Sequence, residues 1–340
     1  MTATGPNTSL DTIETSAPPQ LPNDYRLYRR RHCQSEWEAA YELYVELDDI
    51  ETAQRSERFE ACRSFAYFAR HSETGEVRVV SSACKLRWCP VCSRARSSFL
   101  VSQVHEWLKT VSRPKFLTLT MKHSNAPLDH QIKWLYARYR KFRVRKLLKR
   151  KISGGIWFFQ LKRSKDGSQW HPHLHTVIDA AYIPQAVVSA EWQKTTGSSS
   201  IVDIRAIRSK KAVSEYVSRY CSKPAQLSDY TLRDRILIHR VFHGRRLCGT
   251  WGTGNHVQLS RKKSADRDSW VSVGSWKAVI MQIQTLSRAR AIVKAWQLNE
   301  TLPEGIHVDY PSAVNQYEEC AESIPRLGIE DLRGNFEEFL

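Results

Sequence analysis

The sequence predicts an α+β fold, in which helices flank a central antiparallel sheet and a metal-binding module precedes that sheet. Short strand-like runs alternate with helical repeats, a turn joins two of the runs as a hairpin, and cysteines with metal-ligand spacing come before them. Hydrophobic residues make up 41% of the 340 residues, so the chain is long and apolar enough for one or two cores.

Each predicted element follows from its hydrophobic period and from the turn residues beside it. We expect helix mainly over 25–71, then over 99–111, 132–152, 186–195, 210–223 and 279–296, and strands over 77–81, 115–120, 156–162, 170–178 and 200–207. The turn at Lys165–Gly167 makes the two strands beside it an antiparallel hairpin. The glycine-rich, basic residues 241–254 fit either a strand or a loop.

Composition divides the chain into four consecutive ranges. We expect a disordered N-terminus over 1–24, a helical zinc-binding module over 25–112, the sheet domain over 113–260, and a helix with an acidic tail over 261–340. The N-terminus lacks the basic and apolar regions of a signal peptide, and no apolar run approaches the ~18 residues of a membrane span. These features predict a bacterial cytoplasmic protein that does not enter a membrane. The acidic tail fits a site for a host factor or plain disorder, and we expect disorder.

The charge of the chain favours a polyanionic partner. The formal net charge is +17, and because the last 40 residues carry −7, residues 1–300 carry +24. Ten Lys or Arg and no acid fall within 133–151, a pattern that fits a phosphate-contacting helix face, although charged faces are usually only solvated. The residues expected to contact DNA are Arg138, Arg140, Lys141, Arg143, Arg145, Arg245 and Arg246.

Four of the eight cysteines have the spacing of a zinc site. Cys89 and Cys92 are two residues apart on a turn that contains Pro90, and Cys84 precedes them. Tetrahedral zinc takes four ligands, so we predict Cys62 as the fourth, with His71 as its substitute. A redox pair is the alternative, but no βαβ pattern accompanies it. The remaining cysteines, Cys33, Cys221, Cys248 and Cys320, have no evident partners in the sequence.

Three histidines alternate along one predicted strand. His171, His173 and His175 occupy every second position, so an extended chain directs all three imidazoles to one face. Imidazole is a frequent ligand of divalent transition metals. A lone histidine would more often be a packing residue, whereas this alternation favours a metal site.

A pair of tyrosines lies on one face of the helix predicted over 210–223. Tyr216 and Tyr220 are four residues apart, and Lys223 follows near the same side. A neighbouring lysine or a metal-polarised phosphate would favour the phenolate and its attack on phosphorus. Taken alone, such a pair more often has a packing role in an amphipathic helix.

Together these motifs resemble those of the HUH endonucleases, and specifically the rolling-circle replication initiators of small plasmids and bacteriophages. A Leu-Thr-Leu-Thr strand, the His-Pro-His-Leu-His strand and the Tyr-x-x-x-Tyr-x-x-Lys helix occur in that family's order, behind a Cys-x-x-x-x-Cys-Pro-x-Cys segment, between about Cys62 and Gly254. The resemblance implies a ferredoxin/RRM-like sheet that holds Mg²⁺ or Mn²⁺ on His173 and His175, with His171 less essential.

The resemblance also assigns the remaining site residues. The third ligand is often Glu in this family, and here Gln160 takes the matching position, with His123 and Asp179 as alternatives. Tyr220 matches the nucleophile and Tyr216 the first tyrosine of two-tyrosine members. Glu215 is one residue out of register with the glutamate that some plasmid members use to activate water.

The implied function is the initiation of plasmid rolling-circle replication. Nicking of single-stranded origin DNA would leave a 5′-phosphotyrosine link and a 3′-OH primer, and the stored phosphodiester would be rejoined later. A host helicase and a polymerase are the expected further partners. A two-tyrosine transposase would share this chemistry, and a zinc-containing DNA-binding protein without catalysis is the alternative of another class.

Overall fold

The computed structural model describes most of the chain between Leu21 and Asp309. The described residues are 21–51, 53–164, 167–209, 213, 216–217, 224–260 and 269–309. By their contacts they form two units, a larger one from 30–61 and 83–260 and a smaller one from 21–29, 62–82 and 269–309. The smaller unit therefore joins segments that are distant in sequence. The sequence prediction used consecutive ranges, and those boundaries stay predictions.

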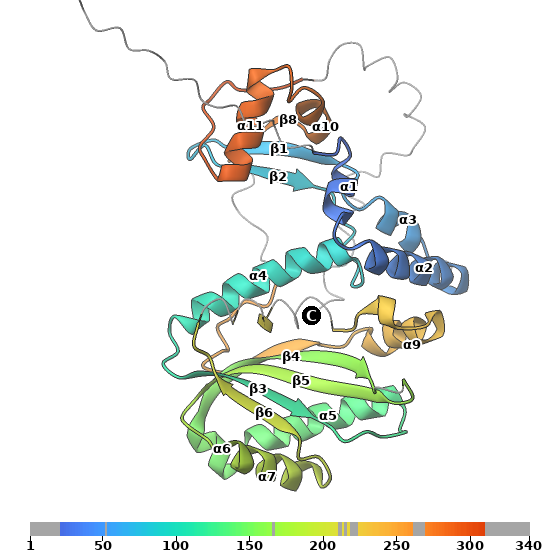
Figure 1. The fold of residues 1–340 in the computed structure, drawn as a ribbon, viewed down its shortest axis with the longest axis vertical. Coiled ribbons are helices and arrows are strands. Elements are labelled where there is room, and N and C mark those ends of the chain that lie inside the picture. The colour runs from blue at the N-terminus through green and yellow to red at the C-terminus, as the bar shows by residue number, and fades with distance from the viewer. Residues whose placement is uncertain are drawn as a thin grey trace, which may run out of the picture. The chain divides into compact units, whose positions relative to one another are not determined.

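A five-stranded sheet forms the centre of the larger unit (Figure 1). Its strands are β3 (Pro114–Thr120), β4 (Ile152–Arg163), β5 (Trp170–Ala180), β6 (Val202–Ala206) and β7 (Cys248–Gly252). They lie in the order β6-β3-β5-β4-β7, and all neighbours are antiparallel. The hairpin predicted between β4 and β5 is confirmed.

Helices between the strands give this sheet a ferredoxin-like connection pattern. α5 (Leu128–Arg143) and α6 (Lys146–Lys151) separate β3 from β4, and α7 (Gln185–Thr196) separates β5 from β6. The resulting β3-α5-β4-β5-α7-β6 succession is a βαββαβ unit, to which β7 adds an edge strand. The predicted α+β class with an antiparallel sheet and flanking helices is confirmed.

The two faces of the sheet are covered by different helices. Side chains alternate between the faces, and α5 and α7 pack on one face, where Tyr136 contacts Phe159. The other face meets α4 (Pro90–Leu108), whose Val104 and Trp107 form a core with Phe158 and neighbouring strand residues. In Figure 1, α4 lies on one side of the sheet and α5, α6 and α7 lie on the other.

Glycines at the start of β4 allow the strands there to approach closely. A Cβ on Gly155 would lie 2.5 Å from the Val177 carbonyl oxygen, and one on Gly154 would lie 2.2 Å from the Thr253 nitrogen. Both distances are too short for any residue with a side chain, so glycine is required where β4 is enclosed by β5 and β7.

Three further α-helices of the larger unit have both ends within the described residues. They are α2 (Gln34–Glu51), α3 (Arg55–Glu60) and α9 (Leu232–Phe242). Trp37 of α2 stacks on Phe59 of α3 with ring centroids 4.0 Å apart. The carboxylate of Glu36 accepts hydrogen bonds from the backbone nitrogens of Leu227 and Ser228, at 3.3 and 3.2 Å, which connects α2 to the segment before α9.

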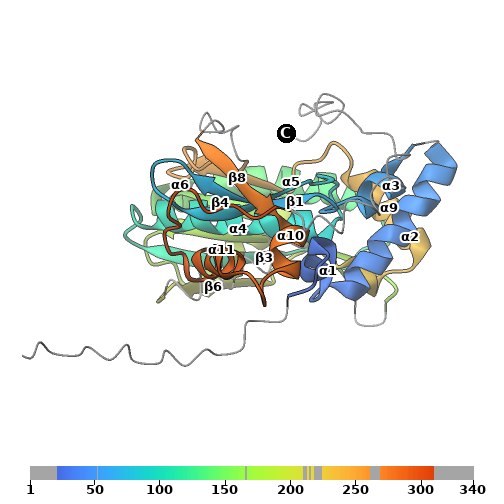
Figure 2. The same ribbon diagram turned by 90° about the horizontal axis from the view of Figure 1, so that it is seen from above.

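The smaller unit is a three-stranded sheet with helices on one face (Figure 2). Its strands lie in the order β2 (Val77–Ser81), β1 (Ala66–His71) and β8 (Trp270–Ser275), and its helices are α1 (Tyr25–Arg30), α10 (Trp276–Met281) and α11 (Ser287–Leu298). Aromatic rings make its core, where Phe68 of β1 stacks on Trp276 with centroids 5.3 Å apart.

Several predicted segments differ from the structure. The long helix predicted over 25–71 is three helices followed by strand β1, and the helices predicted over 132–152 and 279–296 are each two helices. The breaks fall at short irregular links that a periodicity window averages over. The strand predicted over 77–81 is confirmed with the same bounds. No helix in the described part of the chain has the length and apolar character needed to cross a membrane.

Candidate metal centres and active site

The four predicted cysteines converge in the structure. The sulfur atoms of Cys62, Cys84, Cys89 and Cys92 all lie within 4.8 Å of one another, and all four residues are buried. Among the described residues, these cysteines are the one group of three or more His, Cys, Asp or Glu side chains whose ligand atoms lie close enough together to hold a metal ion. Four converging thiols match the tetrahedral coordination of zinc. His71, the predicted substitute, is used elsewhere, because its Nδ1 accepts from the backbone nitrogens of Glu73 and Thr74.

The start of α4 holds two of the cysteines in position. Cys89 is the N-cap of the helix, Pro90 follows it, and the Cys89 sulfur accepts from the Cys92 nitrogen at 3.5 Å. The sulfur atoms of Cys84 and Cys92 lie 3.7 Å apart. Lys85, directly after Cys84, has a positive φ of 58°, which reverses the chain towards Cys89. The helix begins nine residues before the predicted start at Phe99, because the metal-site turn also serves as its cap.

The three histidines of β5 share one face of the larger sheet. His171, His173 and His175 lie in a row, with ring centroids 4.2 Å apart for the first pair and 6.0 Å for the second. Strand register places Gln160 of β4 opposite His173, and Thr118 and Thr120 of β3 opposite His175 and His173. The row lies on the face covered by α4, since Val177, two residues beyond His175, packs in the core of that helix.

Two threonines fix the imidazole rings, and the sequence did not single them out. The Thr118 hydroxyl lies 3.1 Å from Nδ1 of His175, and the Thr120 hydroxyl lies 3.1 Å from Nδ1 of His173. If each Nδ1 carries the proton and donates to its threonine, each Nε2 keeps a lone pair for a metal, as in many protein metal sites. The alternating threonines of the predicted strand were a usable signal, because β3 and β5 are antiparallel neighbours.

Gln160 lies beside the histidine pair. Its Oε1 is 3.0 Å from Nε2 of His175, on the side of the ring away from Thr118. The alternatives for a third ligand lie further away along the strands. Asp179 is four residues from His175, or about 13 Å along a strand, and His123 stacks on His171 with centroids 4.2 Å apart. The structure therefore brings Gln160, and neither alternative, to His175.

Burial keeps the histidine pair neutral. Desolvation, with smaller contributions from His171 and His175, lowers the pKa of His173 to about 2. Desolvation, together with the charge of Lys162, lowers the pKa of His175 to about 3. His175 is only 6% exposed. Both rings are therefore neutral near neutral pH, with one ring nitrogen protonated and the other free of a proton, which is the state that binds a metal.

The tyrosine helix is described only in part. Tyr216 is helical, its ring stacks on Phe116 at 3.9 Å between centroids, and its hydroxyl lies 3.3 Å from Nδ1 of His175 and 3.4 Å from the Thr118 hydroxyl. Tyr220 and Lys223 lie outside the described residues, as does Glu215. The structure thus brings one tyrosine of the motif to the histidine row.

The basic residues of α5 and its C-terminal extension lie on the helix layer that covers the opposite face of the sheet from the histidines. Several of them have contacts within the protein. Arg145 pairs with Glu191, Arg245 pairs with Asp129, and Arg138 and Arg143 lie over Trp134 and Trp251. Arg140 and Lys141 are exposed. The Tyr136 hydroxyl donates to the carbonyl oxygen of Arg246 at 2.8 Å.

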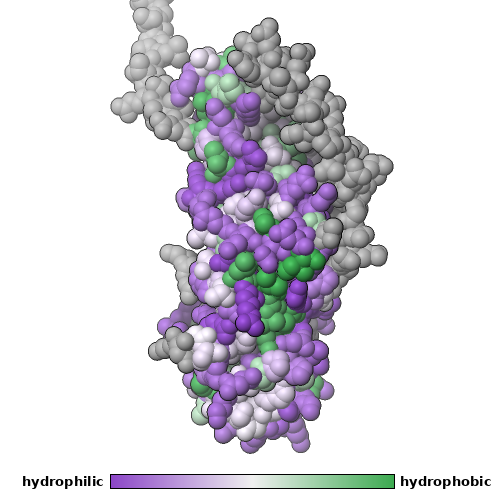
Figure 3. All heavy atoms as spheres, turned by 90° about the vertical axis from the view of Figure 1, so that its right-hand side faces the viewer, coloured by the Kyte–Doolittle hydropathy of each residue, from purple (hydrophilic) through white to green (hydrophobic). Residues whose placement is uncertain are grey.

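The side of the larger unit that carries α9 has apolar as well as charged surface. Figure 3 shows a green apolar area on this side, bordered by hydrophilic side chains. Leu237 and Val241 of α9 and Trp170, the first residue of β5, line a hollow in this unit. Arg163 lies 3.5 Å over the Trp170 ring, and Tyr230 packs beside it. These contacts hold the beginning of the histidine strand in place.

Comparison with known proteins adds a family to this geometry. The family model described as "Replication protein" matches residues 77–274, which include every strand of the larger sheet and both motif strands. The chain belongs to this family. Curated relatives of this replication protein family carry the name "Protein rep". One from a Bacillus species is 27% identical over 47% of this chain and 58% of its own length.

Two further relatives match different shares of the chain. One from Bacillus amyloliquefaciens is 26% identical over 46% of this chain and 51% of its own length. One from Streptococcus pneumoniae serotype 2 is 28% identical over 66% of this chain and 78% of its own length. The chain thus spans between half and three fifths of the first two relatives. No solved structure matches the chain.

Proposed function

We propose that this protein initiates plasmid rolling-circle replication by nicking single-stranded origin DNA. Its membership of the replication protein family supports this role. The observation that carries the chemistry is that Gln160 and Tyr216 both contact His175. Oε1 of Gln160 lies 3.0 Å from its Nε2, and the Tyr216 hydroxyl lies 3.3 Å from its Nδ1. A metal-assisted transesterification needs these types of groups at such distances.

The residues present fit a divalent cation of the Mg²⁺ or Mn²⁺ class. His173 and His175 have threonine partners at Nδ1, and Gln160, opposite His173 in the strand register, brings its amide oxygen to 3.0 Å from Nε2 of His175. An amide oxygen is a neutral ligand for hard cations and binds more weakly than carboxylate. When bound, such a cation would polarise the scissile phosphate and orient it in line with the nucleophile.

Tyr220 is the proposed nucleophile. Its phenolate oxygen would form a bond to phosphorus while the bond from phosphorus to the 3′ oxygen breaks, and the proton lost by tyrosine would end on that 3′ oxygen. The products are a 5′-phosphotyrosine and a free 3′-OH, so no oxidant or second substrate is needed. Lys223 would stabilise the phenolate. The 3′-OH would prime synthesis, and the reverse step would rejoin the ends.

Tyr216 is the proposed second tyrosine. Its ring is fixed on Phe116 and its hydroxyl bonds to His175 and Thr118. It would cleave the newly made origin while Tyr220 still holds the first end, a step that requires its hydroxyl to move from the Nδ1 side of His175 to the Nε2 side, where Gln160 lies. The buried cysteine cluster would bind structural zinc, and host helicase and polymerase would act on the nicked product.

The test offers the full chain single-stranded oligonucleotides tiled over the DNA that encodes it, with Mn²⁺ and then with Mn²⁺ removed. We expect a metal-dependent nick and an SDS-resistant adduct, both lost in Tyr220→Phe and retained for a single turnover in Tyr216→Phe. Full activity of Tyr220→Phe would move the first nucleophile to Tyr216. Absence of any adduct would leave a DNA-binding protein without catalysis. Adducts formed only with the termini of a mobile element would indicate a transposase.

A further inference from the structure

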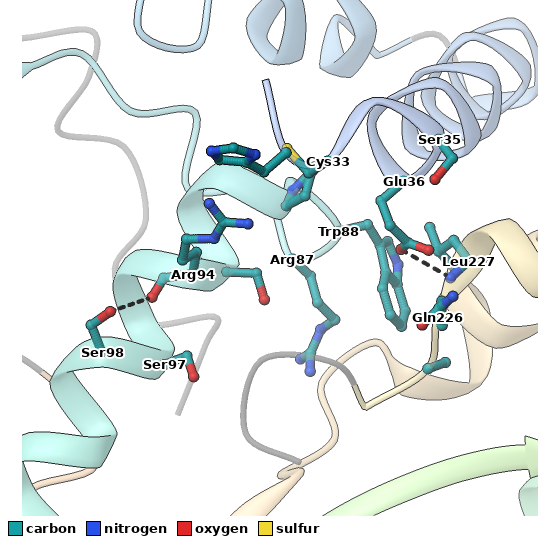
Figure 4. A pocket seen from close by; sticks show the side chains of 14 residues that line it. Cys33, Ser35, Glu36, Arg87, Trp88, Arg94, Ser97, Ser98, Gln226 and Leu227 are labelled. Carbon is teal, nitrogen blue, oxygen red and sulfur yellow. Dashed lines mark hydrogen bonds between the residues drawn. The ribbon is translucent and has the colours of Figure 1, made fainter. Parts of the chain in front are cut away.

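A cavity of about 430 Å³ lies beside α4 in the larger unit (Figure 4). On one side are α4 residues that include Arg94, Ser97 and Ser98, and on the other are Trp88 and residues 225–227. Figure 4 shows Arg87 reaching into the space between these two walls. Two arginines and four serines are among the residues that line the cavity, against one acidic residue, Glu36, so its chemistry suits an anion.

Arg87 is the central group of this cavity. Desolvation, and then the nearby Arg96, lowers the pKa of its guanidinium from the usual value. Among the described residues no carboxylate forms an ion pair with Arg87, and its recorded donor contact is a long one of 3.5 Å from Nη2 to the Arg245 carbonyl oxygen. A guanidinium stays protonated in proteins, so a half-buried positive charge remains here without a described counter-charge.

The acidic side chain in the lining does not supply that counter-charge. Glu36 uses both carboxylate oxygens to accept from the backbone nitrogens of Leu227 and Ser228, and its Oε1 also accepts from the Ser228 hydroxyl. Trp88 presents its ring, because its indole N–H donates to Nδ1 of His239 at 3.2 Å. The groups in the lining that suit an anion include the two guanidiniums of Arg87 and Arg94 and the hydroxyl of the buried Ser97.

The cavity lies close to the proposed site of nicking. Its α4 wall belongs to the helix whose later residues, Val104 and Trp107, pack on the histidine face of the sheet. Its other wall is attached to β4, because the Leu161 nitrogen donates to the Pro224 carbonyl oxygen at 2.7 Å, and Leu161 directly follows Gln160. Ala225 is five residues after Tyr220, which limits their separation to about 18 Å. A DNA strand bound at the histidines could reach the cavity within a few nucleotides.

We propose that this cavity binds a backbone phosphate of the single-stranded DNA that continues from the nick, through Arg87, Arg94 and Ser97. The inference rests on the proposed function and names a site that binds the strand beyond the scissile phosphate. Paired guanidinium and hydroxyl donors are the groups that proteins use for phosphate contacts, which position a strand without reading its bases. The face opposite the histidines, where the basic residues of α5 lie, is not required for this contact.

The test measures DNA affinity separately from nicking, using the zinc-loaded full chain and fluorescent oligothymidylate at several salt concentrations. We expect Arg87→Gln and Arg94→Gln each to weaken binding about tenfold and to reduce the salt slope by about 0.7, as for one lost phosphate contact to a single strand. The nicking rate at saturating DNA should stay close to that of the wild type. Arg113→Gln is the matched control, because Arg113 is exposed at the far end of β3 from the histidines.

The outcomes separate the cavity from the catalytic proposal. If both arginine variants bind with the wild-type affinity and salt slope, or if Arg113→Gln loses as much, the cavity proposal is wrong even when the chain nicks DNA. If no variant nicks DNA but the affinity losses appear as expected, the proposed catalysis fails and the cavity proposal stands. Arg94 is exposed, so Arg94→Gln decides the case if Arg87→Gln loses zinc or unfolds.

Discussion

The cysteine cluster, which could hold a metal ion, and the histidine row, which is proposed to hold another, are completed differently. The cysteine cluster has four thiols within 4.8 Å of one another, all of them buried. The histidine row brings two imidazoles and one amide oxygen together, and His173 is only partly buried. A four-ligand buried cluster leaves no position for a substrate, whereas two or three ligands beside a partly open face leave positions for one.

The two regions also differ in what supports them. The cysteines are held by local chain geometry, namely the cap of α4 and the left-handed residue after Cys84. The histidines are held by three strands that are distant in sequence, since β3 supplies the threonines and β4 supplies Gln160. Damage to the first region should therefore appear as lost folding, and damage to the second as lost activity in a folded protein.

The largest effect is expected at the cysteine cluster. Cys89→Ser should remove the bound zinc and lower the free energy of unfolding by about 4 kcal/mol or more, because the ion stabilises only the folded state. Zinc content and chemical denaturation measure the two losses. Cys33→Ser is the control, because its half-buried thiol lies outside the cysteine cluster. A stable, zinc-free Cys89→Ser protein would show that the cluster is not structural.

The second effect is expected at the histidine pair. His175→Ala should reduce the rate of metal-dependent nicking by about a hundredfold to a thousandfold, the range for losing one preorganised electrostatic contact. Zinc content should not change, since the ring is not part of the cysteine cluster. His171→Ala is the matched control, because His171 lies on the same face of β5, and it should retain most of the rate. Equal losses in both variants would contradict the assignment of the metal to His173 and His175.

A smaller effect is expected at the threonines of β3. Thr118→Val and Thr120→Val keep the shape of the side chain but remove the hydroxyl that bonds to Nδ1. Loss of such a partner typically weakens metal affinity or activity by about tenfold to a hundredfold. Titration of nicking against Mn²⁺ should therefore show a higher half-maximal concentration with recovery at saturation. A lower maximal rate without this shift would assign the hydroxyls a role other than orienting the rings.

The sequence predicted the parts of these sites that depend on local spacing. Alternation placed His173 and His175 on one face, and the spacing of Cys84, Cys89 and Cys92 identified a cluster, because both patterns lie within a few residues. The hydrophobic period also predicted the antiparallel sheet. Helix ends were less well predicted, as at α4, where the cap that decides the boundary is a metal-site cysteine.

The contacts that depend on strand register could not be predicted from the sequence. Thr118 and Thr120 acquire their partners only because β3 lies beside β5 in one register, and a shift by one residue would turn both hydroxyls to the opposite face. The sequence also did not show which face of the sheet the basic stretch of α5 covers. It packs on the face opposite the histidines, a placement set by the handedness and order of the strand connections.

The smallest effect concerns pH and tests whether water is excluded from the histidine row, as the burial of His175 indicates. Burial holds the pKa of His175 at about 3, against 6.5 for an unfolded imidazole, so the unfolded chain binds the extra proton once the pH falls below 6.5. The folded state should therefore lose stability as the pH falls from 7.5 to 5.5, by about 1 kcal/mol for this ring. Comparison with His175→Gln isolates the contribution of His175 to the pH dependence of the free energy of unfolding, because the wild type and the variant carry the same cysteine cluster. Denaturation without added Mg²⁺ or Mn²⁺ should give a steeper fall for the wild type. Parallel curves would mean that water or a counter-charge reaches His175 in the folded protein, and the row would then be open along its whole length rather than at His171 and His173 alone.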